Sequence, residues 1–382
     1  NKQTYKMQLI FLIIAISILS YASCTTQNGF NRTRDSNIIS IHGNIFLKDG
    51  QRWSPKGIAY QPTDGLDALE DANFDTVRDL VHGRWRDLGI NSVRVYQVNV
   101  ASEISHRLVM DYLLEHGIYV IVGAVDQYSA IDRSNPYYGA NYAVRLRMVA
   151  DKFARYDNVL AFSIGNEVLD SATPLQYPIP SIMKAGARDL RKYMKERGFR
   201  QIPIMMAERD DPKFTLDAAQ MMFCGSPEER MDIVGYNCYR WGQGTLEDQM
   251  NAYGILHDDF KAMNPPVPIV FTEYGANAIK PRYFHQIPYL YGEKMVNSTL
   301  GQGALMDMSE VFSGGFVFRY HEVGHGWGLI NSDGEPTESG GYKYLVKEYN
   351  EIHRFRGSSN GIEYTPCRAG NPYNLPLPPS PF

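Results

Sequence analysis

The feature that most constrains the fold is a regular alternation of short β-type runs and helical stretches along the chain. Eight runs rich in Val, Ile and aromatic residues recur at 57–62, 92–98, 119–125, 159–168, 202–207, 232–239, 268–275 and 314–320. Strands separated by helices are joined by crossovers and lie parallel, and eight such units close into a (β/α)8 barrel. A doubly wound open sheet is the competing topology, but eight comparable units favour closure.

The stretches between these runs have apolar residues at helical spacing. Gly89, Gly117 and Gly198 follow three of them as stop residues. The pattern predicts helices over 73–88, 106–115, 142–156, 182–197, 216–223, 246–263, 283–296 and 342–355. The helix at 216–223 is expected to be short.

Both flanks of the barrel have their own pattern. Residues 38–53 contain short β-type runs separated by Gly43-Asn44 and Asp49-Gly50, which predicts a capping β-hairpin before the barrel. We place the barrel at 38–356. Residues 357–382 are loop-like and end in a proline-rich segment, so we expect an extended tail without a second folded module.

The first residues read as an export segment. Lys2 and Lys6 precede an apolar run that is too short for a membrane span of about 20 residues, so we assign 1–24 as a signal peptide. Residues 25–37 are polar and are expected to form a tether. Two outcomes remain open at Cys24: lipid attachment at the cysteine, or ordinary cleavage near Ala22. Either predicts a secreted or surface-associated protein.

Composition excludes some partners. The 382 residues have a formal net charge of -4 and no long basic run, which argues against nucleic acid. The 26 Tyr and 4 Trp offer flat faces with polar tips that suit sugar rings. We expect a neutral, polar substrate, no cofactor, and a chain that acts as a monomer.

Two of the β-type runs end in carboxylates. The run at 159–168 ends in Asn166-Glu167-Val168, and the run at 268–275 contains Glu273 near its end. In a barrel of this type the active site is built at the C-terminal ends of the strands. Two carboxylates presented there are the pair that glycoside cleavage requires, one as proton donor and one as nucleophile or base.

A competing motif is the H-E-x-x-H sequence at 321–325. This spacing binds zinc when a helix brings both imidazoles onto one face. Here the motif follows a β-type run, and Gly324, Gly326 and Gly328 disfavour a sustained helix. We therefore predict no metal site.

Seven motifs resemble one known family in order along the chain. They are Gly-Ile-Ala-Tyr-Gln-Pro at 57–62, Asn-Ser-Val-Arg-Val-Tyr at 91–96, Gly-Asn-Glu-Val at 165–168, Phe-Cys-Gly at 223–225, Gly-Tyr-Asn-Cys-Tyr at 235–239, Thr-Glu-Tyr-Gly at 272–275 with Pro-Arg at 281–282, and Ser-Gly-Gly-Phe-Val at 313–317. Together they resemble the β-1,3-glucanosyltransferases of glycoside hydrolase family 72. The resemblance runs from about Gly57 to Pro379.

The resemblance implies roles for individual residues. Glu167 is implied as acid/base, Glu273 as nucleophile, and Asn166 as the group that binds the sugar 2-hydroxyl. Implied glucan contacts are Gln61, Tyr96 and Tyr239. Arg94 also lies near a strand end, and its positive charge is expected to keep Glu273 charged.

The cysteines are also interpreted through the family. Cys224 and Cys367 match a family pair, so the resemblance implies a disulfide between them and leaves Cys238 as a free thiol. Two other family bridges are absent in both halves. Arg78 and Val109 replace one pair, and Gly242 (or its neighbour) and Ala276 replace the other.

Departures from the family lie at the expected cleft. Gly123 aligns with a family aspartate, and Asp126 is a candidate to replace it. Phe318 aligns with a family tyrosine, and Tyr320 is a candidate there.

We expect a retaining enzyme with carboxyl groups about 5 to 5.5 Å apart that takes β-1,3-glucan as donor and acceptor. The alternatives are an endo-β-1,3-glucanase or related β-glycanase, and a non-catalytic surface protein that binds glucan.

Overall fold

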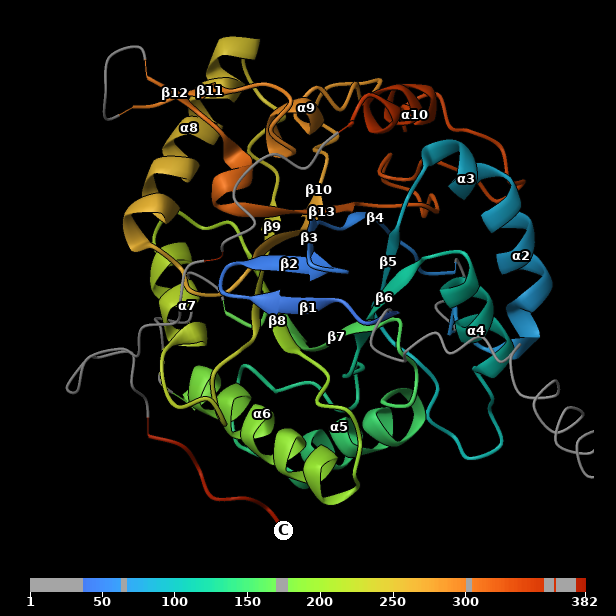
Figure 1. Ribbon diagram of the computed structural model, residues 1–382, viewed down its shortest axis with the longest axis vertical. Helices are drawn as coiled ribbons and strands as arrows, with labels where there is room; N and C mark the ends of the chain where they lie inside the picture. The colour runs from blue at the N-terminus through green and yellow to red at the C-terminus, as the bar shows by residue number, and fades with distance from the viewer. Residues whose placement is uncertain (1–36, 63–66, 170–177, 300–303, 354–360, 362–375) are drawn as a thin grey trace, which may run out of the picture. The chain divides into compact units, whose positions relative to one another are not determined.

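Eight parallel strands form a closed barrel surrounded by helices (Figure 1). The computed structural model describes residues 37–62, 67–169, 178–299, 304–353, 361 and 376–382, and these belong to one unit, Asn37–Phe382. The predicted signal peptide and nearly all of the tether lie outside the described residues. The barrel strands are β4 (Lys56–Ala59), β5 (Ser92–Val95), β6 (Tyr119–Gly123), β7 (Val159–Asn166), β8 (Ile204–Arg209), β9 (Ile233–Cys238), β10 (Ile269–Tyr274) and β13 (Phe312–Val317).

The strand order around the barrel follows the chain. Each strand pairs with the next, and β13 pairs with both β10 and β4 to close the ring. All eight predicted runs are strands, so the predicted (β/α)8 barrel is confirmed. A short antiparallel pair, β11 (Val296–Asn297) and β12 (Leu305–Met306), lies outside the barrel.

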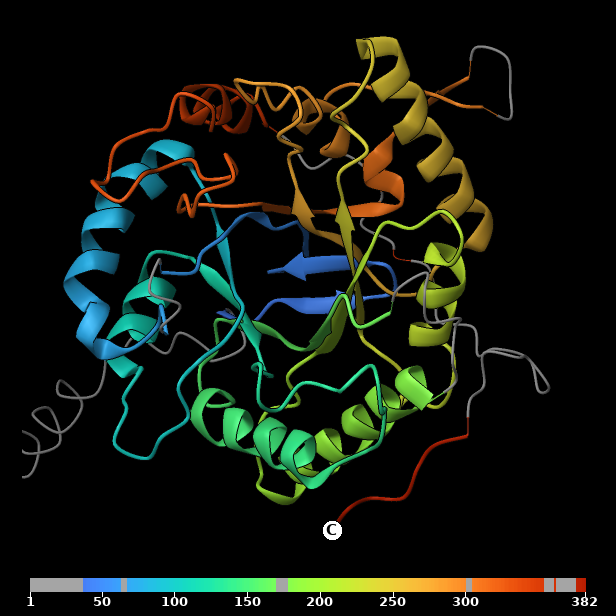
Figure 2. The ribbon, with the colours of Figure 1, turned by 180° about the vertical axis from the view of Figure 1, so that it is seen from behind.

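Helices cover the outside of the barrel (Figure 2). Those described are α2 (Phe74–His82), α3 (Arg84–Leu88), α4 (Arg107–Glu115), α5 (Ala140–Phe153), α6 (Pro178–Glu196), α7 (Thr215–Phe223), α8 (Leu246–Met263), α9 (Ile287–Leu290) and α10 (Tyr342–Asn350), with 3-10 turns η2 (Asp71–Asn73) and η3 (Met308–Glu310). None of the described helices is both long enough and apolar enough to span a bilayer.

Two predicted helices differ from the structure. The helix predicted over 73–88 is divided at Gly83, whose φ of -107° and ψ of -108° are not helical. The helix predicted over 283–296 is wrong, because only Ile287–Leu290 is helical there. Phe284 and Gly292 have positive φ values of 57° and 76°, which end regular helix on both sides.

A small antiparallel sheet covers the N-terminal end of the barrel. It contains β1 (Ser40–His42), β2 (Ile45–Lys48) and β3 (Gln51–Trp53), so the predicted capping hairpin is extended by a third strand. Figure 1 shows β1 and β2 in front of the barrel strands. Phe46 and Trp53 lie in one buried cluster with barrel residues Tyr119, Ile121 and Phe316. This sheet therefore closes the barrel interior at the end opposite to the strand tips.

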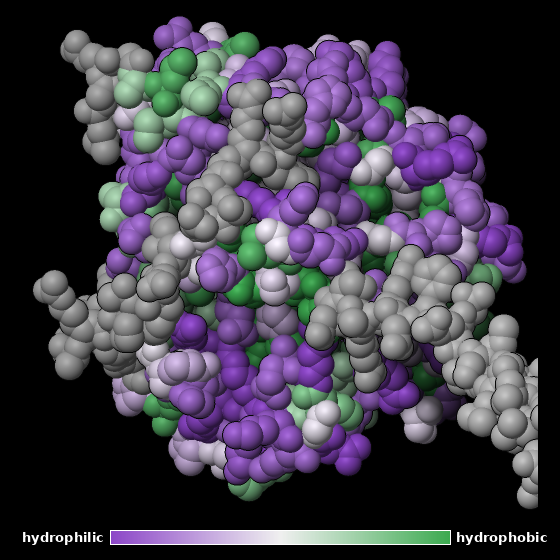
Figure 3. Space-filling view, viewed as in Figure 1, coloured by the Kyte–Doolittle hydropathy of each residue, from purple (hydrophilic) through white to green (hydrophobic). Residues whose placement is uncertain are grey.

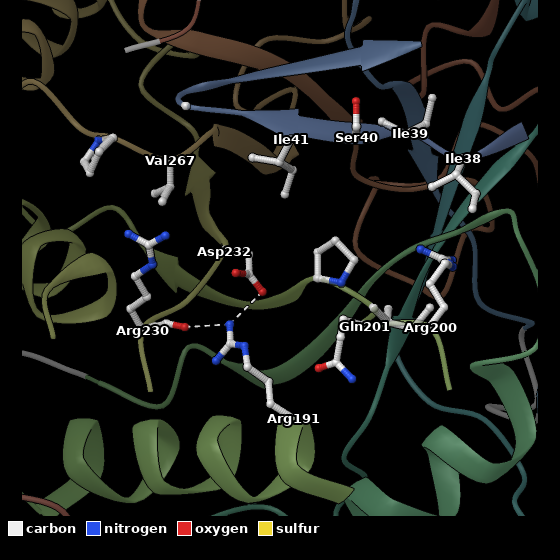
Figure 4. A pocket seen from close by; sticks show the side chains of 14 residues that line it. Ile38, Ile39, Ser40, Ile41, Arg191, Arg200, Gln201, Arg230, Asp232 and Val267 are labelled. Atoms are coloured by element: carbon white, nitrogen blue, oxygen red, sulfur yellow. Dashed lines mark hydrogen bonds and ion pairs between the residues drawn. The ribbon is translucent and has the colours of Figure 1, made fainter. Parts of the chain in front are cut away.

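A cavity of about 440 Å³ lies between this sheet and the base of the barrel (Figure 4). Arg191 from α6 crosses it and donates to Asp232 over 2.6 Å, and Asp232 in turn accepts the backbone N–H of Ile204 at the start of β8. The face seen in Figure 3 is mostly hydrophilic, with apolar residues near its centre. We interpret the contacts of Asp232 with Arg191 and Ile204 as structural, because they connect α6 to the start of β8 at the base of the barrel.

The end of the proline-rich tail lies against the helices. Residues 376–382 have no helix or strand. Arg188 of α6 donates to the Pro378 carbonyl over 3.2 Å, and the Arg147 guanidinium lies 3.6 Å from the centre of the Phe382 ring. The described part of the tail therefore contacts α5 and α6 without regular secondary structure.

Candidate active site

Glu273 lies near the C-terminal end of β10 and is surrounded by hydrogen-bond donors. It is 6% exposed. Its Oε1 accepts from Arg94 over 3.0 Å and from the Tyr96 hydroxyl over 2.8 Å, and its Oε2 accepts from the Tyr239 hydroxyl over 2.7 Å. The guanidinium and the two phenols thus provide three hydrogen bonds that fix the orientation of this buried carboxylate.

The two tyrosines remain donors at all physiological pH values. Burial raises the pKa of Tyr96 well above its usual range, and the negative charge of Glu273 raises it further. The same causes, in the same order, raise the pKa of Tyr239. Since both phenols stay protonated, each directs its O–H toward a Glu273 oxygen and fixes the orientation of the carboxylate.

Glu167 follows β7 directly and is more exposed than Glu273. Its backbone has φ of 49°, a left-handed conformation that is rare for a residue with a Cβ atom. Its Oε1 accepts from Asn237 Nδ2 over 2.7 Å, and Arg209 lies 3.9 Å from its Oε2. The side chain is 32% exposed, so protons and sugar hydroxyls have access to it.

Asn166 and Arg94 connect the two carboxylates. Arg94 donates from one nitrogen to Glu273 and from the other to Asn166 Oδ1, the latter over 2.7 Å. Asn237 also donates to Asn166 Oδ1 over 3.3 Å. The oxygen of the exposed Asn166 is occupied by two donors, so its NH₂ group is the part of the amide that can donate to a further partner. That group is positioned to donate to a ligand.

The structure brings Gln61 close to this cluster. Gln61 Oε1 accepts the backbone N–H of Tyr96 over 3.2 Å, so the amide lies beside the strand that presents both Arg94 and Tyr96. The predicted set of Glu167, Glu273, Asn166, Arg94, Tyr96, Tyr239 and Gln61 is thus assembled at one end of the barrel.

The structure does not place Tyr320 with the cluster, which corrects that prediction. Tyr320 is 1% exposed, and its ring packs against Tyr60 and Trp85 at centroid distances of 5.6 and 6.4 Å. In a regular strand, residues 318 and 320 would lie on the same side. Because β13 ends at Val317, this alternation does not extend to them. Phe318 remains in the cluster, 6.4 Å from the rings of both Tyr96 and Tyr239.

Asp126 lies on the loop after β6. Its carboxylate accepts from the Ser129 hydroxyl over 2.9 Å and lies 3.5 Å from Arg145. It lines a hollow of about 260 Å³ with Gln97 and Tyr128. A side chain at Gly123 has no room, because its Cβ would lie 1.9 Å from the Tyr96 carbonyl oxygen. Position 123 is therefore a packing position, and Asp126 is the nearby carboxylate that faces solvent.

Three residues of the cluster were not among the predicted site residues. Asn237 is 1% exposed and holds Glu167, while its own oxygen accepts from Thr272 over 2.7 Å. The sequence signal is its place near the end of a buried β-type run, and its role follows from the register of β9 with β10, in which it pairs with Glu273. Phe318 and Trp327 flank the Tyr239 ring, at 6.4 and 5.0 Å. Trp327 lies on a loop, where no periodicity indicates it.

The H-E-x-x-H motif forms a loop and not a helix, as its glycines predict. Glu322 accepts five backbone N–H groups, from Val323, Gly324, His325, Gly326 and Gly328, at 2.6 to 3.1 Å. The carboxylate therefore organises the loop that carries Trp327. Among the described residues, no group of three or more His, Cys, Asp or Glu is arranged to hold a metal ion.

Comparison with known proteins adds evidence that is independent of this geometry. Residues 29–353 match the family model described as glucanosyltransferase, glycoside hydrolase family 72. This chain belongs to that family. The chain is 34% identical to 1,3-beta-glucanosyltransferase GAS5 of Saccharomyces cerevisiae over 342 residues, which cover 86% of this chain and 66% of the relative. It is 30% identical to protein EPD1 of Candida maltosa over 382 residues, covering 96% and 65%.

Solved structures of the family have the same fold. Saccharomyces cerevisiae Gas2p in complex with laminaritriose and laminaritetraose is similar to this chain with a TM-score of 0.75 at 27% identity, covering 90% of this chain and 78% of that one. A Glu-to-Gln variant of Gas2p was solved with laminaritetraose and laminaripentaose. The chain spans 54% to 66% of the length of the first four curated relatives.

The cysteines of this glucanosyltransferase-family chain are partly described. Cys224 is in a disulfide. Cys238 is free and buried, and burial raises the pKa of its thiol to about 12. Cys367 lies outside the described residues, so its pairing with Cys224 stays a prediction. Gly242 packs directly against Ala276, because a Cβ at position 242 would lie 2.3 Å from the Ala276 Cβ.

Proposed function

We propose that this chain is a retaining β-1,3-glucanosyltransferase that cleaves a β-1,3-glucan and joins the fragment to a second glucan chain. The observation that supports it best is the environment of Glu273, a buried carboxylate held by Arg94, Tyr96 and Tyr239. Glu167 lies in the same hydrogen-bonded cluster through Asn237 and Asn166. The laminari-oligosaccharides bound to the related Gas2p support the substrate class.

In the first step, Glu273 attacks the anomeric carbon of the donor. Its three donors hold the carboxylate in one orientation, with an oxygen available for attack. Glu167 gives its proton to the departing glycosidic oxygen, which leaves with the reducing-end fragment. The products are a glycosyl ester on Glu273 and a free glucan fragment.

In the second step, Glu167 acts as a base. Formation of the ester removes the negative charge of Glu273, and this favours the ionised form of Glu167. Glu167 takes the proton of an acceptor hydroxyl, whose oxygen attacks the anomeric carbon and releases Glu273. The configuration is inverted twice and hence retained.

Sugar contacts are proposed for the polar groups that face the opening. The NH₂ group of Asn166 is assigned to the sugar 2-hydroxyl, because its oxygen is already occupied by Arg94 and Asn237. Gln61, Tyr96 and Tyr239 are proposed as further contacts. Asp126 is proposed on the acceptor side through the hollow that it lines with Gln97 and Tyr128.

Incubation with reduced laminari-oligosaccharides, followed by analysis of product sizes, tests this function. Hydrolysis can only shorten a chain, so products longer than the starting chain require transfer. Longer products are expected. Shorter products alone would make the protein a glucanase, and unchanged chains would make it a glucan-binding protein.

We also propose that residues 1–24 direct export, so that the enzyme acts outside the cell or at its surface as a monomer. The polar and apolar pattern of these residues and the naming of relatives as glucanosyltransferases support this. Mass spectrometry of the mature N-terminus distinguishes cleavage near Ala22 from lipid attachment at Cys24. Light scattering of the purified protein tests the monomer.

A further inference from the structure

Glu208 is a buried carboxyl group beside the candidate acid/base and has no part in the reaction as described above. It is near the end of β8 and is 5% exposed. Its Oε1 accepts the backbone N–H groups of Val168 and Leu169 over 3.2 and 3.1 Å, and its Oε2 lies 3.3 Å from the Leu169 nitrogen. Both donors follow directly after Glu167.

The end of β8 therefore binds three consecutive N–H groups of this turn. The N–H of Glu167 donates to the Ala207 carbonyl over 2.8 Å, and the next two N–H groups donate to the Glu208 carboxyl. The turn that they form holds Glu167 at φ of 49°. A residue with a Cβ atom adopts this conformation only when its surroundings enforce it.

We propose that Glu208 is a positioning residue that holds the left-handed turn at Glu167 and so aims the acid/base at the glycosidic oxygen. This inference rests on the role proposed for Glu167. Without the Glu208 acceptor, two backbone N–H groups lose their partner and the turn can relax toward an ordinary conformation. The Glu167 side chain would then leave the geometry that proton transfer needs.

The surroundings of Glu208 favour a neutral acceptor. Burial raises its pKa to about 8, the N–H of Leu169 opposes the rise, and the charge of Glu167 adds to it. Arg209 lies on its own strand and Tyr236 comes from β9, while the packed residues of α7 and α8 (Thr215, Ala218, Ala219, Met222 and Phe260) have no charge. At neutral pH, Gln is therefore a close substitute for the working form of Glu208.

Two substrates that differ in their need for an acid catalyst can distinguish a misplaced Glu167 from a general loss of protein stability. Cleavage of a laminari-oligosaccharide requires protonation of the leaving oxygen, whereas a β-laminari-oligosaccharyl fluoride loses fluoride with little help. Azide as acceptor needs no base. A misplaced Glu167 should therefore slow the first substrate and spare the fluoride and azide reaction.

The test compares Glu208→Leu, Glu208→Asp and Glu208→Gln in the full chain. Glu208→Leu removes the acceptor. Glu208→Asp shortens the side chain by one methylene, so its carboxyl no longer reaches the N–H groups of Val168 and Leu169. For both we expect kcat on laminari-oligosaccharides to fall about 10- to 100-fold with little change in KM, and the rate with fluoride and azide to fall less than about 3-fold. Glu208→Gln should stay within about 3-fold of the parent on both substrates.

Two controls complete the test. Glu348 is also a buried carboxyl, 6% exposed, but lies on α10, so Glu348→Leu should leave both rates unchanged. Glu167→Gln should reproduce the selectivity of Glu208→Leu. If Glu208→Leu does not fold, Glu208→Asp tests the inference in its place. Equal losses on both substrates, no loss, or a Gln variant as slow as Leu would overturn the inference, whereas an inactive parent would instead refute the proposed function.

Discussion

At the scale of single residues, the account depends on Glu273 as nucleophile. Replacement by Gln keeps the size and most hydrogen bonds of the side chain but removes the attacking charge. We expect Glu273→Gln to lower turnover of laminari-oligosaccharides by at least about 10³-fold. Product analysis by chromatography measures the loss, and circular dichroism should show an unchanged fold. Activity that persists in this variant would refute the assignment.

Tyr239 gives a second residue-scale prediction. It donates to Glu273 Oε2 over 2.7 Å, and a hydrogen bond to a charged group is worth about 1.5–3 kcal/mol. Tyr239→Phe should therefore lower kcat/KM about 10- to 100-fold. Tyr236→Phe is the matched control, because that hydroxyl lies near Arg240 and contacts neither carboxylate. Similar losses in both variants would contradict the role of Tyr239.

The sequence predicted the residues of the site better than their interactions. Glu167, Glu273 and Arg94 could be found because each ends or lies within a buried β-type run. Asn237 has the same type of position, but only the register of β9 with β10 shows that it reaches Glu167. Tyr320 was a candidate for the cleft because it lies near Phe318, which aligns with a family tyrosine, but the strand has already ended at Val317.

At the scale of elements, the loop after β13 depends on Glu322. Burial raises the pKa of Glu322, but the backbone N–H groups of Gly328, His325, Gly326 and Gly324 lower it more, to about 2 from 4.5. This stabilisation is fully present above pH 4.5 and is lost as the pH falls toward 2. Since the carboxylate is partly exposed, we expect about 1–2 kcal/mol.

Glu322→Gln tests this prediction by urea unfolding at pH 7 and pH 3. The variant should be less stable than the parent by about 1–2 kcal/mol at pH 7, and the difference should shrink at pH 3. Glu335→Gln is a suitable control, because that exposed carboxylate has only a salt bridge to Arg84 at 3.3 Å. A difference that does not depend on pH would contradict the role of the Glu322 charge.

The helices show which elements periodicity determines. The long helices α5, α6 and α8 lie within a few residues of their predicted bounds because an apolar face defines each of them, and Gly198 also marks the end of α6. The helix predicted over 283–296 failed because the apolar residues Ile287, Tyr289 and Leu290 are buried in a short turn. Local backbone conformation at Phe284 and Gly292 prevails over the periodic pattern there.

At the scale of the whole molecule, eight repeated units were sufficient to predict a closed barrel, because parallel strands with right-handed crossovers leave few other topologies. A hairpin was predicted at the N-terminus, and the third strand, Gln51–Trp53, follows the second of the two predicted turns, Asp49-Gly50. The close packing of Gly123 against Tyr96 also requires the folded barrel, because the two residues come from neighbouring strands.

The disulfide of Cys224 gives a prediction at this scale. Peptide mapping without reduction should yield Cys224 linked to Cys367, and Cys224→Ser should lower the free energy of unfolding by about 2–5 kcal/mol. Cys238 should resist thiol reagents until the protein is unfolded, because it is buried and its pKa is raised to about 12. Linkage of Cys224 to Cys238 would contradict the prediction.

The central claim is a double displacement through a covalent ester on Glu273. Incubation with a 2-deoxy-2-fluoro laminari-oligosaccharyl fluoride should trap that ester, because the 2-fluoro group slows both formation and breakdown of the ester, whereas the good leaving group speeds formation alone. Peptide mass spectrometry is expected to find the glycosyl label on Glu273. A label on Glu167, or no label on a protein that still turns over laminari-oligosaccharides, would contradict the account.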